Sequence, residues 1–220
     1  MFIGHFGVGF GAKPVAPKVS LGTLFFAAQF VDLLWPALLL LGLERVRIDP
    51  QATVVTPLAF DHYPISHSLL ANLGWALLVG IGYYLLRRNR RGAIVVGLLV
   101  LSHWVLDLFM HRPDLPLYPG SETTLGLNAW SSLPLTLAIE LPIFALGVWL
   151  YTRATTPRDA VGRWALVGLV AFLLVVYTSN LLGPPPPSAI AIAWMGQAQW
   201  LLVLWAYWVD KHRSTETKYP

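Results

Sequence analysis

Residues 92–110 read GAIVVGLLVLSHWVLDLFM, and this stretch decides the fold class. A helix rises about 1.5 Å per residue, so a run of this length crosses a hydrocarbon core of about 30 Å. Among its apolar side chains stand the polar residues Ser102, His103 and Asp107. Similar apolar runs recur along the chain, and we therefore expect an all-α, polytopic membrane helix bundle.

The composition supports a single membrane domain over residues 1–210. Of the 220 residues, 56% are hydrophobic and 12% are charged, and the mean hydropathy is +0.60, whereas about 25% of the residues of a typical soluble domain are charged. About six spans are predicted, at residues 19–43, 66–86, 92–110, 133–152, 162–182 and 190–209. Residues 1–12 are apolar but too short to cross, which predicts a half-membrane or interfacial helix. Residues 211–220 predict a polar, mobile cytoplasmic tail.

Positively charged residues alternate by loop and predict the orientation. Arg and Lys gather before the first span, after the second and after the fourth, and few lie in the intervening loops. Because positively charged loops stay in the cytoplasm, both termini are expected there, in a prokaryotic inner membrane. The loops at 44–65, 111–132 and 183–189 then face the outside. The net charge of +4 serves orientation, so the expected partner is the bilayer and no nucleic acid.

Ionisable side chains inside the predicted spans are the functional candidates, because burying one in a bilayer is costly. The acids within spans are Asp32, Asp107 and Glu140. His103, Asp107 and His111 are spaced four apart in SHWVLDLFMH, so on a helix they share one face. An i, i+4 pair lets one helix supply two ligands to one metal. The chain has no cysteine, so imidazole and carboxylate groups must hold any metal.

The predicted orientation places several of these side chains at one depth, in the outer half of the bilayer. Counted along the helices at about 1.5 Å per residue, they converge from separate segments. They are Asp32, His67, His103 and Glu140, with Asp61 and His62 just outside the second span. His5 reaches this level only if residues 1–12 dip into the membrane. We therefore expect a shared polar site, with binding of a divalent metal as the further step.

Each of these residues also has a simpler interpretation. His67 or His111 at a span end can be an interfacial hydrogen-bonding group, and Asp107 can merely neutralise a neighbouring histidine. Asp32 can be a proton-relay carboxylate. Glu140 can bond to backbone groups freed by the proline that follows it. These alternatives stay open at the level of sequence.

Four short blocks within the first 120 residues carry a family resemblance. They are GHFGVGFGAK (4–13), FFAAQFVDLLWP (25–36), YPISHSLL (63–70) and VLSHWVLDLFMHRPDLPLYPG (100–120). In this order the chain resembles the YdjM-like family of LexA-binding, inner-membrane-associated, metal-dependent hydrolases. The resemblance implies that the site consists of His5, Asp32, His67, His103 and Asp107.

Two positions depart from the family pattern. The family shows an acidic pair in its first long helix, whereas this chain has the single Asp32 in QFVDLL. Ser66 stands where the family block has threonine, which is a mild change. One expected carboxylate is therefore missing from the implied set.

The hypothesis that follows is hydrolysis by a metal-activated water. A divalent ion, most readily Zn²⁺, would be held by His67, His103, Asp107 and one or both of His5 and Asp32. It would lower the pKa of a bound water to about 7 and make that water the nucleophile.

The other candidates take catalytic roles in this hypothesis. Asp61 or Glu140 would act as general base, and His111 or Arg112 would stabilise developing negative charge. Ser66 is not expected as a nucleophile, because neighbouring residues on a helix do not face each other. The depth suggests a lipid or lipid-linked ester, amide or phosphate as substrate. Two other classes stay open: a proton- or cation-coupled transporter or channel, and a non-catalytic membrane interaction protein.

Overall fold

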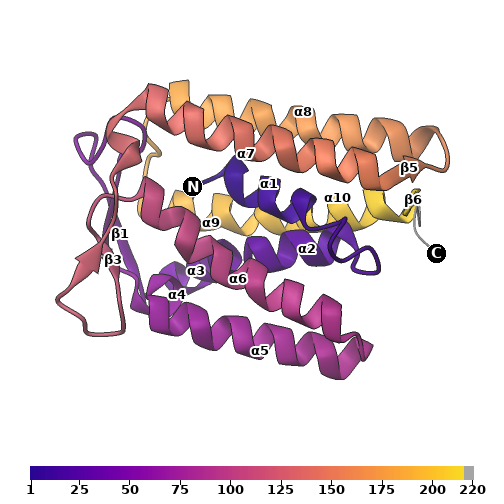
Figure 1. Ribbon diagram of the computed structural model, residues 1–220. Helices are drawn as coiled ribbons and strands as arrows, with labels where there is room; N and C mark the ends of the chain where they lie inside the picture. The colour runs from indigo at the N-terminus through magenta and orange to yellow at the C-terminus, as the bar shows by residue number, and fades with distance from the viewer. Residues whose placement is uncertain (216–220) are drawn as a thin grey trace.

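The computed structural model describes residues 1–215, and helices dominate it. The helices are α1 (Ile3–Gly11), α2 (Leu21–Ala28), α3 (Phe30–Leu40), α4 (Pro64–His67), α5 (Leu69–Arg87), α6 (Arg90–Met110), the 3₁₀ helix η1 (Ala129–Ser131), α7 (Leu133–Ala154), α8 (Ala160–Leu182), α9 (Ala189–Gln197) and α10 (Gln199–Lys211). Figure 1 shows the hairpin α5–α6 on one side of a central layer that holds α1, α2, α3, α9 and α10, and α7 and α8 on the other side. There α7 packs against α1, and α8 packs against α10. The expected all-α polytopic bundle is confirmed.

Five helical segments are long and apolar enough to cross a membrane. They are α5, α6, α7, α8 and the segment that α9 and α10 form together. α2 and α3 pass the same test as a pair, and they meet at an angle of 56°. The predicted first span at 19–43 is therefore not one straight helix but a broken one. The predicted last span is interrupted briefly at Ala198.

The break between α2 and α3 lies at Gln29, whose φ of −103° and ψ of 5° end the first helix. It frees the carbonyl of Ala28, which accepts a hydrogen bond from His103 Nδ1 at 2.9 Å. Further along, Pro36 has no N–H to donate to the carbonyl four residues earlier. The side chain of Gln199 donates to that carbonyl at 3.4 Å instead. Both irregularities thus turn backbone carbonyls toward neighbouring helices.

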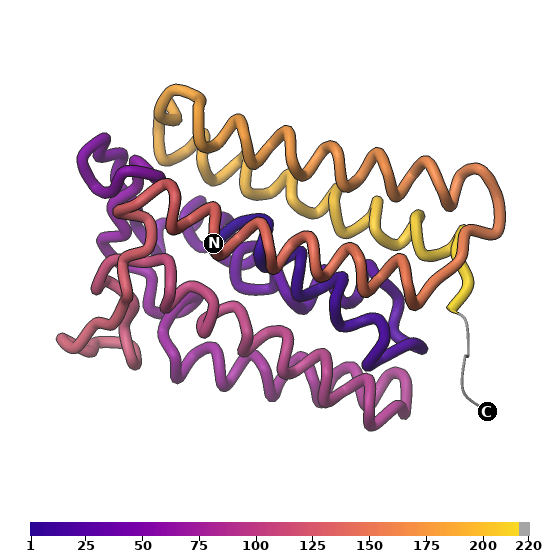
Figure 2. Tube along the Cα trace, turned by 45° about the horizontal axis from the view of Figure 1, so that its top comes forward, coloured from indigo at the N-terminus to yellow at the C-terminus, as the bar shows by residue number. Residues whose placement is uncertain are grey.

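The first helix, α1, is short and lies inside the bundle, where it packs against α7. Gly7 and Gly147 permit the close approach, because a Cβ atom on either one would overlap the backbone of the other helix. Beyond the helix, the buried Lys13 amine donates to Asp210 at 2.8 Å. Figure 2 shows the N-terminal segment running within the bundle. The short N-terminal helix, expected as half-membrane or interfacial, is therefore present, and it carries His5 into the bundle.

Short strands close one end of the bundle. β1 (Arg45–Ile48) pairs antiparallel with β2 (Leu58–His62), and β3 (Leu115–Pro116) pairs antiparallel with β4 (Thr124–Leu125). Figure 1 shows β1 and β3 together at the end where α6 finishes and α7 begins. The single turn α4 follows β2 directly, so these strands position the start of α5 and the residues just before it.

At the opposite end, the polar C-terminal segment is ordered as far as the structure describes it. β6 (Arg213–Thr215) pairs antiparallel with β5 (Thr155–Pro157). The guanidinium of Arg213 donates to both the side chain and the carbonyl of Thr155. The expectation of a mobile tail is therefore wrong for its first residues, while the rest of the tail, with Lys218, lies outside the described residues.

Large apolar side chains cover the outer faces of α5 and α8. Leu77 and Leu86 on α5 and Val175 on α8 are among those that are mostly exposed. Faces of this kind on helices of membrane-spanning length belong in contact with lipid. The chain is therefore an integral membrane protein.

Candidate metal centre

The four-residue spacing of His103 and Asp107 on α6 places both side chains on one buried face. His103 Nε2 lies 3.2 Å from Asp107 Oδ2, and both residues are at most 1% exposed. The ring donates from Nδ1 to the Ala28 carbonyl at 2.9 Å. In a neutral imidazole the other nitrogen is then unprotonated. In this neutral form, the Nε2 lone pair of His103 faces the carboxylate.

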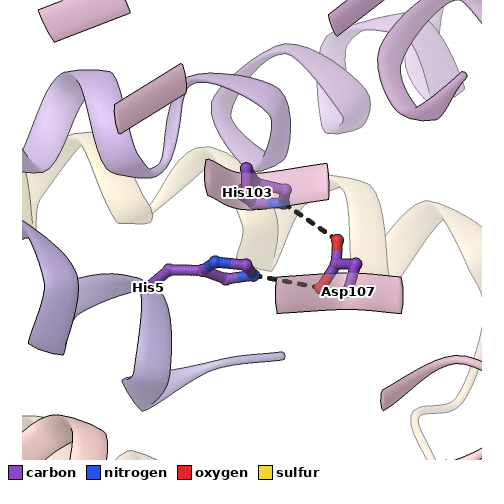
Figure 3. Close-up of side chains that lie close together, drawn as sticks. All are labelled: His5, His103 and Asp107. Atoms are coloured by element: carbon purple, nitrogen blue, oxygen red, sulfur yellow. Dashed lines mark hydrogen bonds and ion pairs between the residues drawn. The ribbon is translucent and has the colours of Figure 1, made fainter. Parts of the chain in front are cut away.

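His5 reaches the same point from α1. Its ring stacks on that of His103, with centroids 3.7 Å apart and planes inclined by 5°. Its Nε2 lies 3.1 Å from Asp107 Oδ1. Figure 3 shows the two rings one above the other, each facing a different oxygen of Asp107. The inward dip of the first residues is therefore what brings His5 to the centre.

Asp32 and His67 complete the cluster from α3 and α4. Asp32 Oδ1 lies 3.5 Å from His67 Nε2 and 3.6 Å from His103 Nε2. His67 Nε2 also lies 3.8 Å from Asp107 Oδ2. The Asp32 side chain keeps an exposed fraction of 21%, whereas His67 is buried. Asp32 is therefore the most accessible member of the cluster.

These side chains form two overlapping groups in which the ligand-type atoms lie within 4.8 Å of one another. One group is His5, His103 and Asp107, and the other is Asp32, His67 and His103. The structure thus brings together all five residues that the sequence predicted as ligands. The shared His103 Nε2 makes no hydrogen bond within the described part of the chain. A buried lone pair that faces two carboxylates is stabilised by a cation between them, so this donor set fits a divalent metal.

The start of α1 adds three hydrogen bonds, one to the cluster and two beside it. The amino group of Met1 donates to Asp107 Oδ1 at 2.6 Å. On α7, Glu140 Oε2 accepts the N–H groups of Phe2 at 3.0 Å and of Gly4 at 3.2 Å. Backbone nitrogens of the first four residues therefore reach Asp107 and Glu140. Glu140 lies next to the centre, where it binds the first turn of α1.

His111 follows α6 and stands next to the cluster without joining it. Its Nδ1 lies 2.9 Å from Asp114 Oδ1, which also accepts the Tyr63 hydroxyl at 2.9 Å. The ring centroid lies 4.4 Å from that of Trp130 and 6.4 Å from that of His67. Burial lowers the pKa of His111, against the opposing effect of the Asp114 carboxylate. A neutral His111 held by a carboxylate is therefore available at the edge of the centre.

The structure does not bring Asp61 to the centre. It lies on β2 with an exposed side chain, and its two oxygens bind Arg47 of β1 at 2.7 and 3.1 Å. The neighbouring His62 is also exposed. The pairing of the two strands directs both residues outward, so Asp61 is not placed as a general base. Arg112 is engaged with Asp114 at 3.2 Å.

Two residues near the centre were not predicted from the sequence. Glu44 is 1% exposed and accepts a hydrogen bond from Ser66, the residue before a cluster histidine. Asp114 holds His111. Both acids lie in loops, where no helical spacing relates them to their partners. The one available signal was an acid, Glu44, that directly follows the apolar run ALLLLGL.

The fold and this cluster together define a polytopic integral membrane protein with a buried histidine–aspartate centre between its helices. The profile of the YdjM inner membrane protein family matches residues 16–182, and the chain therefore belongs to this family. The match confirms the resemblance found in the sequence and covers every cluster residue except His5. No curated protein and no solved structure shows a match to the chain.

Proposed function

We propose that this protein is a metal-dependent hydrolase that works within the membrane. The observation that carries the proposal is the convergence of three imidazole Nε2 atoms and two carboxylates from four helices. Imidazole and carboxylate groups without thiolates are typical ligands of catalytic Zn²⁺. Zn²⁺ is therefore the proposed ion, held by His5, Asp32, His67, His103 and Asp107.

In the proposed reaction, the ion would activate water and the side chains would transfer protons. Bound Zn²⁺ would lower the pKa of a water molecule to about 7 and so supply a nucleophile at neutral pH. His111 is held through Nδ1 by Asp114, so its second nitrogen is the group offered to a leaving group or to developing negative charge. Glu140 is the remaining candidate for general base, because it adjoins Asp107 through the start of α1 and Asp61 points away.

The proposed substrate is a lipid or lipid-linked ester, amide or phosphate. A groove of about 490 Å³ lies between the end of α3, the start of α9 and β1, and it supports this class. Leu39 and Ile190 contribute apolar side chains to the groove, and the charged residues in its lining include Arg45 and the Arg47–Asp61 pair. The apolar part of this lining suits an acyl chain. The loop distribution of Arg and Lys supports a site in the outer half of the bilayer.

The first test is the metal content of the detergent-purified protein after dialysis. We expect about one divalent ion per chain in the wild type, and loss of that ion in His103→Ala and Asp107→Asn, each of which removes a ligand. His212→Ala is the control, because this histidine binds Asp159 at 2.7 Å at the other end of the bundle. Folded wild-type protein that takes up no metal even when Zn²⁺ is resupplied would contradict the metal centre.

Hydrolysis is tested on the same proteins with phospholipid and lipid-linked substrates in mixed micelles. Release of fatty acid, amine or phosphate should require the metal and should be lost in Asp107→Asn. Metal-loaded protein that releases none of these products from the whole panel would contradict the reaction while leaving the metal centre in place.

A proton- or cation-coupled transporter is the second candidate, and the broken pair α2–α3 favours it. Binding sites of membrane transporters commonly lie where a helix is discontinuous, and here the break at Gln29 lies just before Asp32. Within the described residues, one helix pair is bent to this degree. Proteoliposomes that take up protons or cations without bound metal, and that lose uptake with Asp32→Asn, would favour transport over hydrolysis.

A further inference from the structure

A line of hydrogen bonds leads from His67 away from the centre. His67 Nδ1 lies 2.6 Å from Ser66 Oγ, and Ser66 Oγ lies 2.5 Å from Glu44 Oε2. The second oxygen of Glu44 accepts the backbone N–H groups of Ile65 and Ser66, both at 2.8 Å. The Glu44, Ser66 and His67 residues are at most 3% exposed. The carboxylate is therefore enclosed and bound by three donors.

The direction of each bond follows from the groups involved. A carboxylate only accepts, so the Ser66 hydroxyl donates its single proton to Glu44. Ser66 Oγ can then only accept from His67, whose ring proton must be on Nδ1. In the neutral ring the lone pair is left on Nε2, and Nε2 is the atom that faces Asp32 and Asp107.

We propose that Glu44 and Ser66 are positioning residues that fix the ring orientation and the tautomer of His67 for metal binding. This inference rests on the proposed metal centre. Ligating histidines generally donate their second ring nitrogen to a carboxylate or a carbonyl, and such outer contacts raise the basicity of the ligand. His103 uses the Ala28 carbonyl in this way. His67 uses a carboxylate through one serine hydroxyl.

A purely structural role for Glu44 would account for only two of its three hydrogen bonds. Binding the two N–H groups of the single turn α4 needs one carboxylate oxygen. The other oxygen adds nothing to that cap, but it completes the connection to His67. Two of the three donors to this carboxylate are needed for α4, and the third orients the ligand.

The close contact of Ser66 with His67 corrects the expectation that neighbouring residues do not face each other. That rule holds within a regular helix, but α4 is a single turn and the chain becomes extended at Ser68, with ψ of 147°. Ser66 is nonetheless not placed as a nucleophile, because it is fully buried and its proton is committed to Glu44.

The test is a titration with Co²⁺, an ion that occupies Zn²⁺-type sites and whose visible spectrum reports its coordination. Purified wild-type protein and variants are titrated in detergent against a competing chelator. Ser66→Ala removes the hydroxyl that links Glu44 to His67. We expect this variant to bind Co²⁺ about 10- to 100-fold more weakly and to alter the spectrum of the bound ion. Ser66→Thr keeps the hydroxyl, so it should bind Co²⁺ as the wild type does.

Glu44→Gln tests the direction of the bonds at nearly constant volume. The amide oxygen has to stay with the two backbone N–H donors, so the amide N–H₂ faces Ser66. The serine then accepts from the amide and donates to His67 Nδ1, which moves the ring proton to Nε2. Because protonated Nε2 cannot bind a metal, we expect a loss of Co²⁺ affinity as large as that of Ser66→Ala.

Ser68→Ala is the matched control. Ser68 is also buried, and it caps α5 by accepting the N–H of Ala71 at 3.3 Å. This variant should lose some stability but keep its affinity for Co²⁺. Equal affinity in Ser66→Ala, Glu44→Gln and Ser68→Ala would overturn the inference and leave the metal centre intact. Wild-type protein that binds no Co²⁺ would instead contradict the proposed function, and the inference with it. If Ser66→Ala does not fold, Glu44→Gln carries the comparison.

Discussion

Glu140 is the residue that joins α7 to the start of α1. The first N–H groups of a helix have no partner within that helix, and α1 has no side-chain cap from its own sequence. Glu140 Oε2 accepts two of these N–H groups inside the bundle. One helix therefore supplies the cap of another, and this arrangement satisfies a buried carboxylate at the same time.

Replacing Glu140 should consequently destabilise the fold. In Glu140→Ala the N–H groups of Phe2 and Gly4 lose their acceptor, which costs about 1–3 kcal/mol for a buried group left unpaired. Unfolding of the purified protein in increasing sodium dodecyl sulfate measures the change. Asp61→Ala is the control, because the Asp61–Arg47 pair is exposed and such pairs contribute little. Equal stability of the two variants would show that the α1 cap contributes nothing.

Single residues differ in how far sequence could reveal them. His103 and Asp107 were predictable because ionisable groups stand out in an apolar span and their four-residue spacing tolerates errors in the helix boundary. Glu44 and Asp114 were not, because loop paths bring them to the site only in three dimensions. Asp61 was wrongly predicted as a site residue, because nearness in sequence does not tell which side of a strand a residue occupies.

At the scale of elements, the contact between α1 and α7 depends on glycine. A Cβ atom at position 147 would overlap the carbonyl of Gly7, and one at position 7 would overlap the backbone of α7. A helix of nine residues is too short to be stable by itself. Its position, and hence the position of His5, follows from this packing.

Gly147→Ala should therefore loosen α1. Overpacking of this kind costs about 1–3 kcal/mol, and we expect weaker metal retention as well, because α1 carries His5. Unfolding in detergent and metal content after dialysis measure the two effects. Gly74→Ala on α5 is the matched control, since a Cβ atom there meets nothing within 4 Å. The control should be unchanged or gain up to about 1 kcal/mol from the better helix propensity of alanine. A Gly147→Ala protein as stable as the control would contradict the close packing.

The broken pair α2–α3 shows why one element was mispredicted. Hydropathy responds to composition, and a bent pair of helices is as apolar as one straight helix. The bond that accompanies the break joins the Ala28 carbonyl to His103, which lies 75 positions away. No local pattern in residues 19–43 reports such a distant partner. The lengths of α5 to α8 were predictable, because the bilayer sets them.

For the whole molecule, charge separates the two ends of the bundle. The α5–α6 turn, with Arg87 and Arg90 beside it, lies at the same end as β5 in Figure 1. The strands β1 and β3 lie at the other end. This distribution supports the proposed orientation, in which the arginine-rich end faces the cytoplasm.

Cysteine labelling tests this orientation cleanly, because the chain has no cysteine of its own. Glu122 is exposed in the loop between β3 and β4, and Arg158 is exposed directly after β5. Figure 1 shows β3 and β5 at opposite ends of the bundle. A membrane-impermeant thiol reagent should label Glu122→Cys in intact cells and Arg158→Cys only after lysis. The reverse pattern would place the histidine–aspartate centre nearer to the cytoplasm.

The buried position of α1 also constrains the order in which the protein assembles. His5 precedes its partner Asp107 by 102 positions, so it is synthesised well before Asp107. Glu140, which binds the first turn of α1, follows Gly4 by 136 positions. Because α1 packs against α7, it has no packing partner on that side until α7 has been inserted. The last residue of the cluster, Asp107, lies on α6, and α1 meets its packing partner only once α7 is in place. Under the proposed function, the ion would therefore be bound at the end of assembly and not during translation.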